Sequence, residues 1–287
     1  MNNKIGFFGG KFLPLHNGHV FSIINASQQC DELHVVLFYN TLNEAELIKN
    51  STFNQKFLSP AIRELVLKSE FDSYKNIKLH SIDSSKCFNA ADNGWDNESK
   101  EVIKRCGCEP NIIFTSEKNY EQNFKASYPH AEICYLDTKR NIFNISGTKI
   151  REEGEFKCWD QLPKAYKILC AKSIVFFGAR EKKRTLINDL NKLYQTTCVE
   201  MNNFNNERLK NELLKVRFQA NKVLFINADE NHVDDFKTFY AEQDLLLYID
   251  DGKEVPDFLK QFNVLNIKGA YNEQFLSCIQ SINKLLP

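Results

Sequence analysis

The chain has 287 residues, 43% of them hydrophobic and 26% charged, a composition typical of soluble α/β proteins and long enough for two domains. Lys plus Arg and Asp plus Glu both number 37, so no global positive field attracts nucleic acid or an anionic membrane. Nine scattered cysteines favour reduced thiols, and we predict a cytoplasmic location. Cys106 and Cys108 have no second Cys or His pair at zinc-site spacing, so we predict plain thiols and no metal site. No apolar run approaches the roughly 18 residues that span a bilayer.

In the first half, short apolar runs alternate with segments of helical period. Strands are predicted at Lys4–Gly9, Glu32–Tyr39, Ile77–Ile82, Asn111–Thr115 and Ala131–Leu136, and helices near Asn17–Gln29, Ala61–Phe71, Glu98–Arg105 and Tyr120–Ser127. This β-then-α rhythm predicts a Rossmann-like, mostly parallel sheet with helices on both faces.

The second half starts afresh with the strand Lys172–Gly178, which ends in glycine before a helix. Its companion strands are predicted at Lys222–Ala228, Asp244–Asp250 and Val264–Lys268, with a last helix from about Asn272 to Leu286. We therefore predict two α/β domains, residues 1–152 and a smaller one at 172–287, joined by a helical connector at 153–171.

The segment Gly10–His19 (GKFLPLHNGH) follows a strand and precedes a helix, which places it at the edge of the sheet where α/β proteins bind ligands. Gly9 and Gly10 let the backbone approach a phosphate, and the helix start adds free N–H groups. His16 and His19 are three residues apart, so both can point toward one site. A protonated or donating imidazole there can bind phosphate oxygens and stabilise developing charge.

Taken singly, these residues have ordinary structural explanations, since a lone His often caps a helix and Gly-Gly often forms a turn. The whole string G-x-F-x-P-x-H-x-G-H resembles the nucleotidylyltransferase superfamily with the H-x-G-H signature. Its second signature, I-S-x-T-x-x-R, has a counterpart at Ile145–Arg151 (ISGTKIR). The resemblance implies that Ser146 and Thr148 cap a helix and donate to triphosphate oxygens, while Lys149 and Arg151 supply cations.

Further strings resemble the NadR-type branch, which combines nicotinamide-mononucleotide (NMN) adenylyltransferase and ribosylnicotinamide kinase domains. They include CDELHVV, NGW at Asn93–Trp95, EPNIIFTSE and FKCWDQLPK, and cover about the first 170 residues. The resemblance implies an NMN site with Trp95 as an aromatic platform for the nicotinamide ring, together with Asn93 and Arg140. It implies ATP contacts from Gly9, Gly10, Lys11, Phe12, Gly18, Ser116, Glu117, Ser146 and Thr148.

The implied reaction is the in-line attack of the NMN phosphate on the α-phosphorus of ATP, which yields NAD and pyrophosphate. The acceptor is already an anion, so positioning and electrostatic stabilisation suffice. His16, His19, Lys149 and Arg151 would supply them, with a Mg²⁺ held largely by the triphosphate and no metal ligand set from the protein. The partners expected are ATP, NMN and NAD, without nucleic acid or membrane, and a homo-oligomer stays open.

The second domain departs from the family pattern. The resemblance implies a P-loop kinase-like fold, whose motif G-x-x-x-x-G-K-[ST] corresponds to Gly178–Thr185 (GAREKKRT). Lys183 replaces the second glycine, Arg184 replaces the lysine, and Asn227 stands where an acidic residue is expected. We therefore expect a kinase-like fold without kinase activity, which could stabilise the first domain, assist oligomerisation or regulate.

Two other functions stay open on the sequence alone. The same two motifs serve adenylyl- and cytidylyltransferases for other phosphorylated acceptors. A non-catalytic nucleotide sensor is the alternative outside enzymes, although the presence of His16, His19 and Arg151 argues against it.

Overall fold

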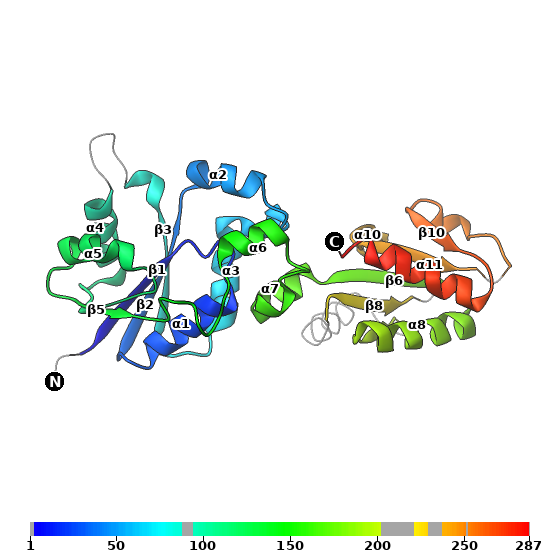
Figure 1. The fold of residues 1–287 in the computed structure, drawn as a ribbon. Coiled ribbons are helices and arrows are strands. Elements are labelled where there is room, and N and C mark those ends of the chain that lie inside the picture. The colour runs from blue at the N-terminus through cyan, green and yellow to red at the C-terminus, as the bar shows by residue number, and fades with distance from the viewer. Residues whose placement is uncertain (1–2, 88–93, 202–220, 229–236, 251, 287) are drawn as a thin grey trace. The chain divides into compact units, whose positions relative to one another are not determined.

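A computed structural model of the protein describes residues 3–87, 94–201, 221–228, 237–250 and 252–286. Its contacts divide the chain into two compact units, Met1–Tyr166 and Lys167–Pro287. Each unit is built on its own parallel sheet of five strands, which confirms the predicted α/β class (Figure 1). Within the described ranges, no helix is both long and apolar enough to cross a bilayer.

The sheet of the first unit has the strand order β3-β2-β1-β4-β5. The central strand is β1, with β2 on one side of it and β4 on the other. The direction in which the chain adds strands to the sheet therefore reverses between β1 and β4. Such a switch point opens a crevice at the carboxyl ends of the strands. The strands are β1 (Ile5–Gly10), β2 (Glu32–Tyr39), β3 (Ile77–Asp83), β4 (Ile112–Thr115) and β5 (Glu132–Tyr135).

Helices cover both faces of this sheet. The face that includes Phe7, Val36 and Ile113 packs against Val102 of α4 and Phe124 of α5, and α1 and α3 contact β1, β2 and β3. The helices of this unit are α1 (Asn17–Ser27), α2 (Thr41–Lys49), α3 (Pro60–Phe71), α4 (Trp95–Cys106), α5 (Glu121–Ser127) and α6 (Gly147–Glu153). Helix α7 (Lys164–Cys170) begins in the first unit and ends in the second. Single turns of 3₁₀-helix lie at Gln55–Leu58, Ser84–Lys86, Lys118–Tyr120 and Trp159–Gln161.

The helix starts show why these segments are helical. Ser59 accepts a hydrogen bond from the N–H of Ile62 and is followed by Pro60 in the first turn of α3. Asn40 caps α2 through the N–H of Asn43 in the same way. These side chains satisfy backbone donors that a helix leaves unpaired at its beginning.

The second unit has the strand order β10-β9-β6-β8-β7, again all parallel. One face packs on α8 and α11, and the other packs on Tyr240 of α10 and Leu259. Its elements are β6 (Lys172–Gly178), α8 (Arg180–Tyr194), β7 (Cys198–Glu200), β8 (Val223–Asn227), α10 (Lys237–Ala241), β9 (Leu245–Ile249), a 3₁₀ turn (Asp257–Leu259), β10 (Val264–Ile267) and α11 (Tyr271–Asn283).

The main element that sequence patterning missed is α2. Its buried side chain is Glu44, whereas Leu42 is 81% exposed, so the helix has no apolar stripe to reveal it. The helix predicted near Glu98–Arg105 begins earlier, at Trp95, directly after Gly94, whose φ of 78° lies in the left-handed region.

Candidate active site

A cavity of about 600 Å³ opens at the carboxyl ends of β1, β2 and β4, next to the switch point. Apolar side chains make up much of its wall, and it is also lined by Asn40 and Ser116, which directly follow β2 and β4. This is the usual character of a small-molecule site. Of the residues predicted for nucleotide binding, those that line it are Gly9, Gly10, Lys11, His19, Trp95, Ser116 and Glu117.

The two histidines of the first motif lie face to face. Their ring centroids are 3.7 Å apart and the ring planes differ by 21°. Nδ1 of His16 accepts a hydrogen bond from the backbone N–H of His19 at 3.3 Å, so His16 caps α1. Phe12, which is buried, presses on His19 with a centroid distance of 5.2 Å. Gly18 lies between the two histidines in the first turn of α1.

Burial keeps both imidazoles neutral. It lowers the pKa of His16 from 6.5 to about 4, and the Arg140 cation adds to the effect. Burial also lowers the pKa of His19 well below 6.5, helped by His16 and Arg140. Without a ligand, each ring is therefore neutral at neutral pH and carries one N–H donor. The sequence allowed either a protonated imidazole or a neutral one that donates, and the lowered pKa values favour the neutral one.

Arg140 and Glu117 form an ion pair at the cavity. Nη2 of Arg140 lies 3.1 Å from Oε1 of Glu117, and each side chain is about half exposed, at 47% and 49%. Exposed pairs of this kind contribute little free energy, so a bound phosphate can replace the carboxylate at Arg140 at small cost. Arg140 is close enough to the histidines to lower their pKa values.

The second motif docks on the first. Ser146 caps α6 by accepting a hydrogen bond from the N–H of Lys149 at 3.1 Å. Nη1 of Arg151 donates to the carbonyl oxygen of Leu13, and Nη2 donates to Oγ1 of Thr148 at 3.2 Å. Gly147 allows this approach, because a Cβ there would lie 2.6 Å from the oxygen of Leu13.

The structure does not bring every predicted residue to the cavity wall. Eight of the predicted residues that the structure describes do not line the cavity: Phe12, His16, Gly18, Arg140, Ser146, Thr148, Lys149 and Arg151. His16 reaches it only through its stacking on His19, and Arg140 through its ion pair with Glu117. Nζ of Lys149 lies 4.0 Å from Oε1 of Glu153, one turn along α6. The expected contact Asn93 lies outside the described residues.

Aromatic side chains form one wall of the cavity. Trp95, the first residue of α4, has ring-centroid distances of 5.4 Å to Tyr120 and 5.5 Å to Phe124. Sequence reasoning identified Trp95 but missed the other two. Tyr120 and Phe124 are four residues apart at the start of α5, and this i, i+4 aromatic pair was a signal for a shared face.

A buried ion pair that sequence reasoning left outside the site supports the loop of the first motif from beneath. Arg63 of α3 donates to the carbonyl oxygen of Lys11 at 2.6 Å and to Oε2 of Glu44 at 2.5 Å. Both side chains are fully buried, at 0% and 1% exposure. The signal was that Arg63 occupies the same helical stripe as Val66 and Leu67, where an apolar residue is the rule.

Comparisons with known proteins show which proteins the chain resembles. No protein-family model matches the chain. The trifunctional NAD biosynthesis/regulator protein NadR of Escherichia coli is 30% identical over 197 residues, which are 67% of this chain and 47% of that protein. Its Salmonella typhimurium counterpart is 31% identical over 199 residues, 68% of this chain and 47% of that protein. The chain spans about half the length of these curated relatives.

The chain also resembles, over a shorter stretch, an adenylyltransferase named for a different acceptor. Phosphopantetheine adenylyltransferase of Streptococcus mutans is 38% identical over 79 residues, 28% of this chain and 41% of that protein. Among solved structures, NadR protein in complex with NR superposes with a TM-score of 0.72 at 16% identity and covers 99% of this chain and 96% of that one. This likeness shows a shared fold. Together the relatives confirm the resemblance that the two motifs indicated.

Proposed function

Because the chain is a homologue of the NadR-type nucleotidylyltransferases, we propose that its first unit transfers AMP from ATP to NMN, forming NAD and pyrophosphate. The observation that carries this proposal is the stacked pair His16–His19 at the end of β1, beside a cavity of about 600 Å³ with an aromatic wall. The charged ends of two nucleotides and a flat pyridinium ring match these two features.

In the proposed reaction, a phosphate oxygen of NMN forms a bond to the α-phosphorus of ATP while the bond to the bridging oxygen breaks. The electron pair leaves with pyrophosphate, and no proton needs to move because the acceptor is already an anion. Nδ1 of His16 accepts the backbone hydrogen bond from His19, so the proton of this neutral ring lies on Nε2. His16 can therefore donate from Nε2 to a phosphate oxygen as negative charge builds on it.

Cationic side chains complete the proposed phosphate site. Lys11 lines the cavity, and Arg140 can exchange Glu117 for a phosphate oxygen. Arg151 acts through position, because its guanidinium holds the carbonyl of Leu13 and so fixes the loop that presents the histidines. A Mg²⁺ ion bound to the triphosphate would offset its charge. The carboxylate of Glu98 on the cavity wall is the type of oxygen donor that this ion accepts.

The aromatic wall favours NMN over other phosphorylated acceptors. A pyridinium ring is a flat cation, and an indole face attracts such a ring. A pantetheine arm is a neutral amide chain and gains less from this wall. The same superfamily motifs serve that acceptor in other proteins, so phosphopantetheine is the second candidate.

The test is NAD formation by the full chain from ATP, Mg²⁺ and NMN, with nicotinate mononucleotide and phosphopantetheine assayed in parallel. We expect NMN to be used best and His19→Ala to lower kcat/KM by about 10²–10³-fold. His130→Ala is the matched control, because His130 is an exposed histidine of the same unit. Turnover with phosphopantetheine alone would disprove the assigned reaction, and full activity in His19→Ala would disprove the role of the stacked histidines.

A second assay isolates the aromatic wall. Trp95→Ala should raise the KM for NMN about tenfold while the KM for ATP changes little, since one lost cation–π contact costs on the order of 1 kcal/mol. Trp95→Phe keeps an aromatic face, so its KM for NMN should lie between the values of the wild type and of Trp95→Ala. Equal KM values for NMN in all three proteins would show that the nicotinamide ring binds elsewhere.

We also propose that the second unit has no ribosylnicotinamide kinase activity. Most of the segment aligned with a P-loop belongs to a regular helix, because only Ala179 separates the end of β6 from Arg180, the first residue of α8. The N–H of Lys183 donates to the oxygen of Ala179, and Oγ1 of Thr185 donates to the oxygen of Glu181. A P-loop needs such backbone N–H groups for phosphate and this hydroxyl for Mg²⁺, but here they form hydrogen bonds within the helix. Metal-dependent phosphorylation of ribosylnicotinamide by the full chain would refute this proposal.

The cellular setting follows from the proposed chemistry. ATP and pyridine nucleotides are cytoplasmic metabolites, and nine free cysteines suit a reducing compartment. We therefore place the enzyme in the cytoplasm, and fractionation of cells that express the tagged chain tests this placement.

A further inference from the structure

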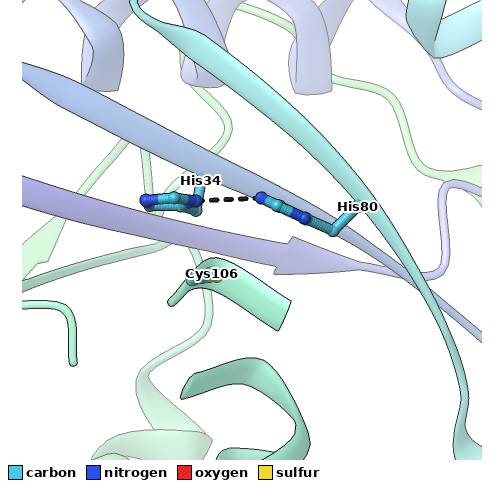
Figure 2. Close-up of side chains that lie close together, drawn as sticks. All are labelled: His34, His80 and Cys106. Carbon is cyan, nitrogen blue, oxygen red and sulfur yellow. Dashed lines mark hydrogen bonds between the residues drawn. The ribbon is translucent and has the colours of Figure 1, made fainter. Parts of the chain in front are cut away.

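Two histidines and a cysteine meet on the first unit, away from the residues that line the nucleotide cavity. His34 comes from β2, His80 from the neighbouring strand β3, and Cys106 is the last residue of α4 (Figure 2). One ligand atom from each lies within 4.8 Å of the others, and His34 is 3% exposed. The parallel register pairs Val36 with His80, so both histidines point to the face of the sheet that α4 covers.

The hydrogen bonds of this cluster fix which nitrogen of His34 is available. Nε2 of His34 lies 2.9 Å from Oε1 of Glu32, and Nδ1 lies 2.9 Å from Nε2 of His80. A carboxylate can only accept in this contact, so the proton of His34 resides on Nε2 and its lone pair on Nδ1 faces His80. A carboxylate that orients one imidazole nitrogen while the other faces a ligand position is the usual outer contact of a zinc-binding histidine.

The distances suit a transition-metal ion in place of the proton between the two rings. Metal–nitrogen bonds of about 2.0–2.1 Å and metal–sulfur bonds of about 2.3 Å separate tetrahedral ligand atoms by roughly 3.3–3.6 Å. The two nitrogens are 2.9 Å apart, so they need to separate by only a few tenths of an ångström. The three ligand atoms lie within 4.8 Å of one another, so the sulfur has to approach by up to about 1 Å. In the metal-free state the proton between the two rings lies on Nε2 of His80, because Nδ1 of His34 accepts. On metal binding Nε2 of His80 would give up this proton, the neutral ring would carry its proton on Nδ1 instead, and Cys106 would release the thiol proton.

Charged neighbours and an adjoining cavity determine whether a cation can bind to this cluster. A thiolate and Glu32 together balance a divalent cation, whereas the nearby cations Lys78 and Arg105 oppose it. Arg105 is itself paired with Glu101 at 2.9 Å, which reduces its effect. A cavity of about 500 Å³ reaches the cluster and is lined by Glu32, His34, His80 and Cys106 among others, so a water molecule can occupy a fourth position.

We propose that His34, His80 and Cys106 bind one Zn²⁺ ion, with Glu32 as the orienting carboxylate and an exchangeable fourth ligand from the cavity. Two imidazoles and one thiolate favour zinc over Mg²⁺, which prefers oxygen ligands. The site ties β2 and β3 to the carboxyl end of α4. It does not depend on the transferase assignment, because these residues line a different cavity.

The test uses the untagged full chain, stripped with a chelator and kept reduced with a phosphine. Titration with Co²⁺ should give one equivalent of bound metal with a thiolate-to-cobalt absorption band, and Zn²⁺ should displace it. Cys106→Ser should lose that band and His80→Ala should weaken Zn²⁺ binding. Glu32→Gln should weaken it about 10–100-fold.

Cys108→Ser is the matched control, because its sulfur lies 3.7 Å from Nε2 of His34, on the side of the ring that Glu32 occupies. We expect this variant to bind Co²⁺ like the wild type. A wild-type protein with no cobalt–thiolate band overturns the proposal, even if the ligand variants fail to fold. So does a Cys106→Ser variant that keeps the band, or a Cys108→Ser variant that loses it.

Discussion

The two units begin with similar strands but continue differently. In the first unit β1 ends at Gly10 and α1 begins only at Asn17, whereas in the second β6 ends at Gly178 and α8 begins at Arg180. The longer connection carries both the docking point for Arg151 and His16. The short one leaves no room for a ligand loop. The ligand site thus depends on the connection that follows the central strand, and not on the strand itself.

A glycine at the end of a strand is therefore weak evidence for phosphate binding. Gly178 has a φ of 109°, and a Cβ there would lie 2.3 Å from the carbonyl oxygen of Ile249 on β9. Close packing between β6 and β9 alone requires this glycine. The similar runs FFGG and VFFG thus reflect the same strand geometry with different consequences.

The largest effect should come from the ion pair beneath the first loop. Arg63→Met should destabilise the first unit by about 3–5 kcal/mol, because it leaves the Glu44 carboxylate buried and unpaired. Both tryptophans lie in this unit, so urea unfolding followed by tryptophan fluorescence measures it separately.

The same helix offers a matched control for the buried pair. Lys68→Met breaks the exposed pair with Glu64, and we expect a change below about 1 kcal/mol. The double variant Arg63→Met, Glu44→Leu should recover much of the loss, since a buried apolar pair can replace a buried ion pair. Equal small effects of Arg63→Met and Lys68→Met would show that the loop does not depend on the buried pair.

A pH titration should give the next largest effect. The pKa of His16 is about 4 in the folded chain and near 6.5 when unfolded, so the unfolded chain binds more protons between these values. Stability of the first unit should therefore fall as pH drops from 6.5 to 4, by on the order of 3 kcal/mol from this group. His16→Asn keeps a side-chain cap for α1 and should remove this part of the slope. An unchanged slope in His16→Asn would contradict the buried neutral ring.

Gly147→Ala should have a smaller effect on stability and a clear one on activity. The added Cβ meets the backbone oxygen of Leu13, so the two motifs must move apart. A displacement approaching 1 Å at a reacting group can cost about 10²-fold in rate, and we expect kcat for NAD synthesis to fall toward that value. Wild-type kcat in this variant would mean that the contact between the motifs does not position the histidines.

The smallest effect is expected in the second unit. Nζ of Lys183 is buried and donates to the carbonyl oxygen of Ala228 at 2.6 Å. Lys183→Met should cost about 1 kcal/mol in the second unit, seen by circular dichroism, and should leave NAD synthesis within about twofold of wild type. A large loss of NAD synthesis would show that the transferase site depends on the second unit.

Patterning predicted most of the sheet elements, because a parallel strand buried on both faces is a continuous apolar run. Glu32–Tyr39 and Lys172–Gly178 were predicted with their observed bounds. The same logic failed at α2, which buries a carboxylate. It also could not reveal the cluster of His34, His80 and Cys106, since pairing of two strands and packing of a helix bring these residues together from distant parts of the chain.

For the candidate site, the motifs identified the residue types, and the structure added their contacts and the pKa shifts of the histidines. The spacing of His16 and His19 predicted a shared site, but the stacking and the lowered pKa values depend on burial by Phe12 and on the field of Arg140. Lys149 carries the predicted charge, yet its side chain lies along α6 toward Glu153. Such details follow from tertiary packing, which spacing alone does not encode.

Helix α4 joins two chemically different ends. Trp95 is its first residue and Cys106 its last, and the eleven steps of 1.5 Å between them span about 16.5 Å. A rigid rod of that length amplifies rotation: a tilt of about 5° about Cys106 would carry the indole about 1.4 Å across the cavity. A rotation of the helix about its carboxyl end would therefore move the indole much farther than it moves the thiol.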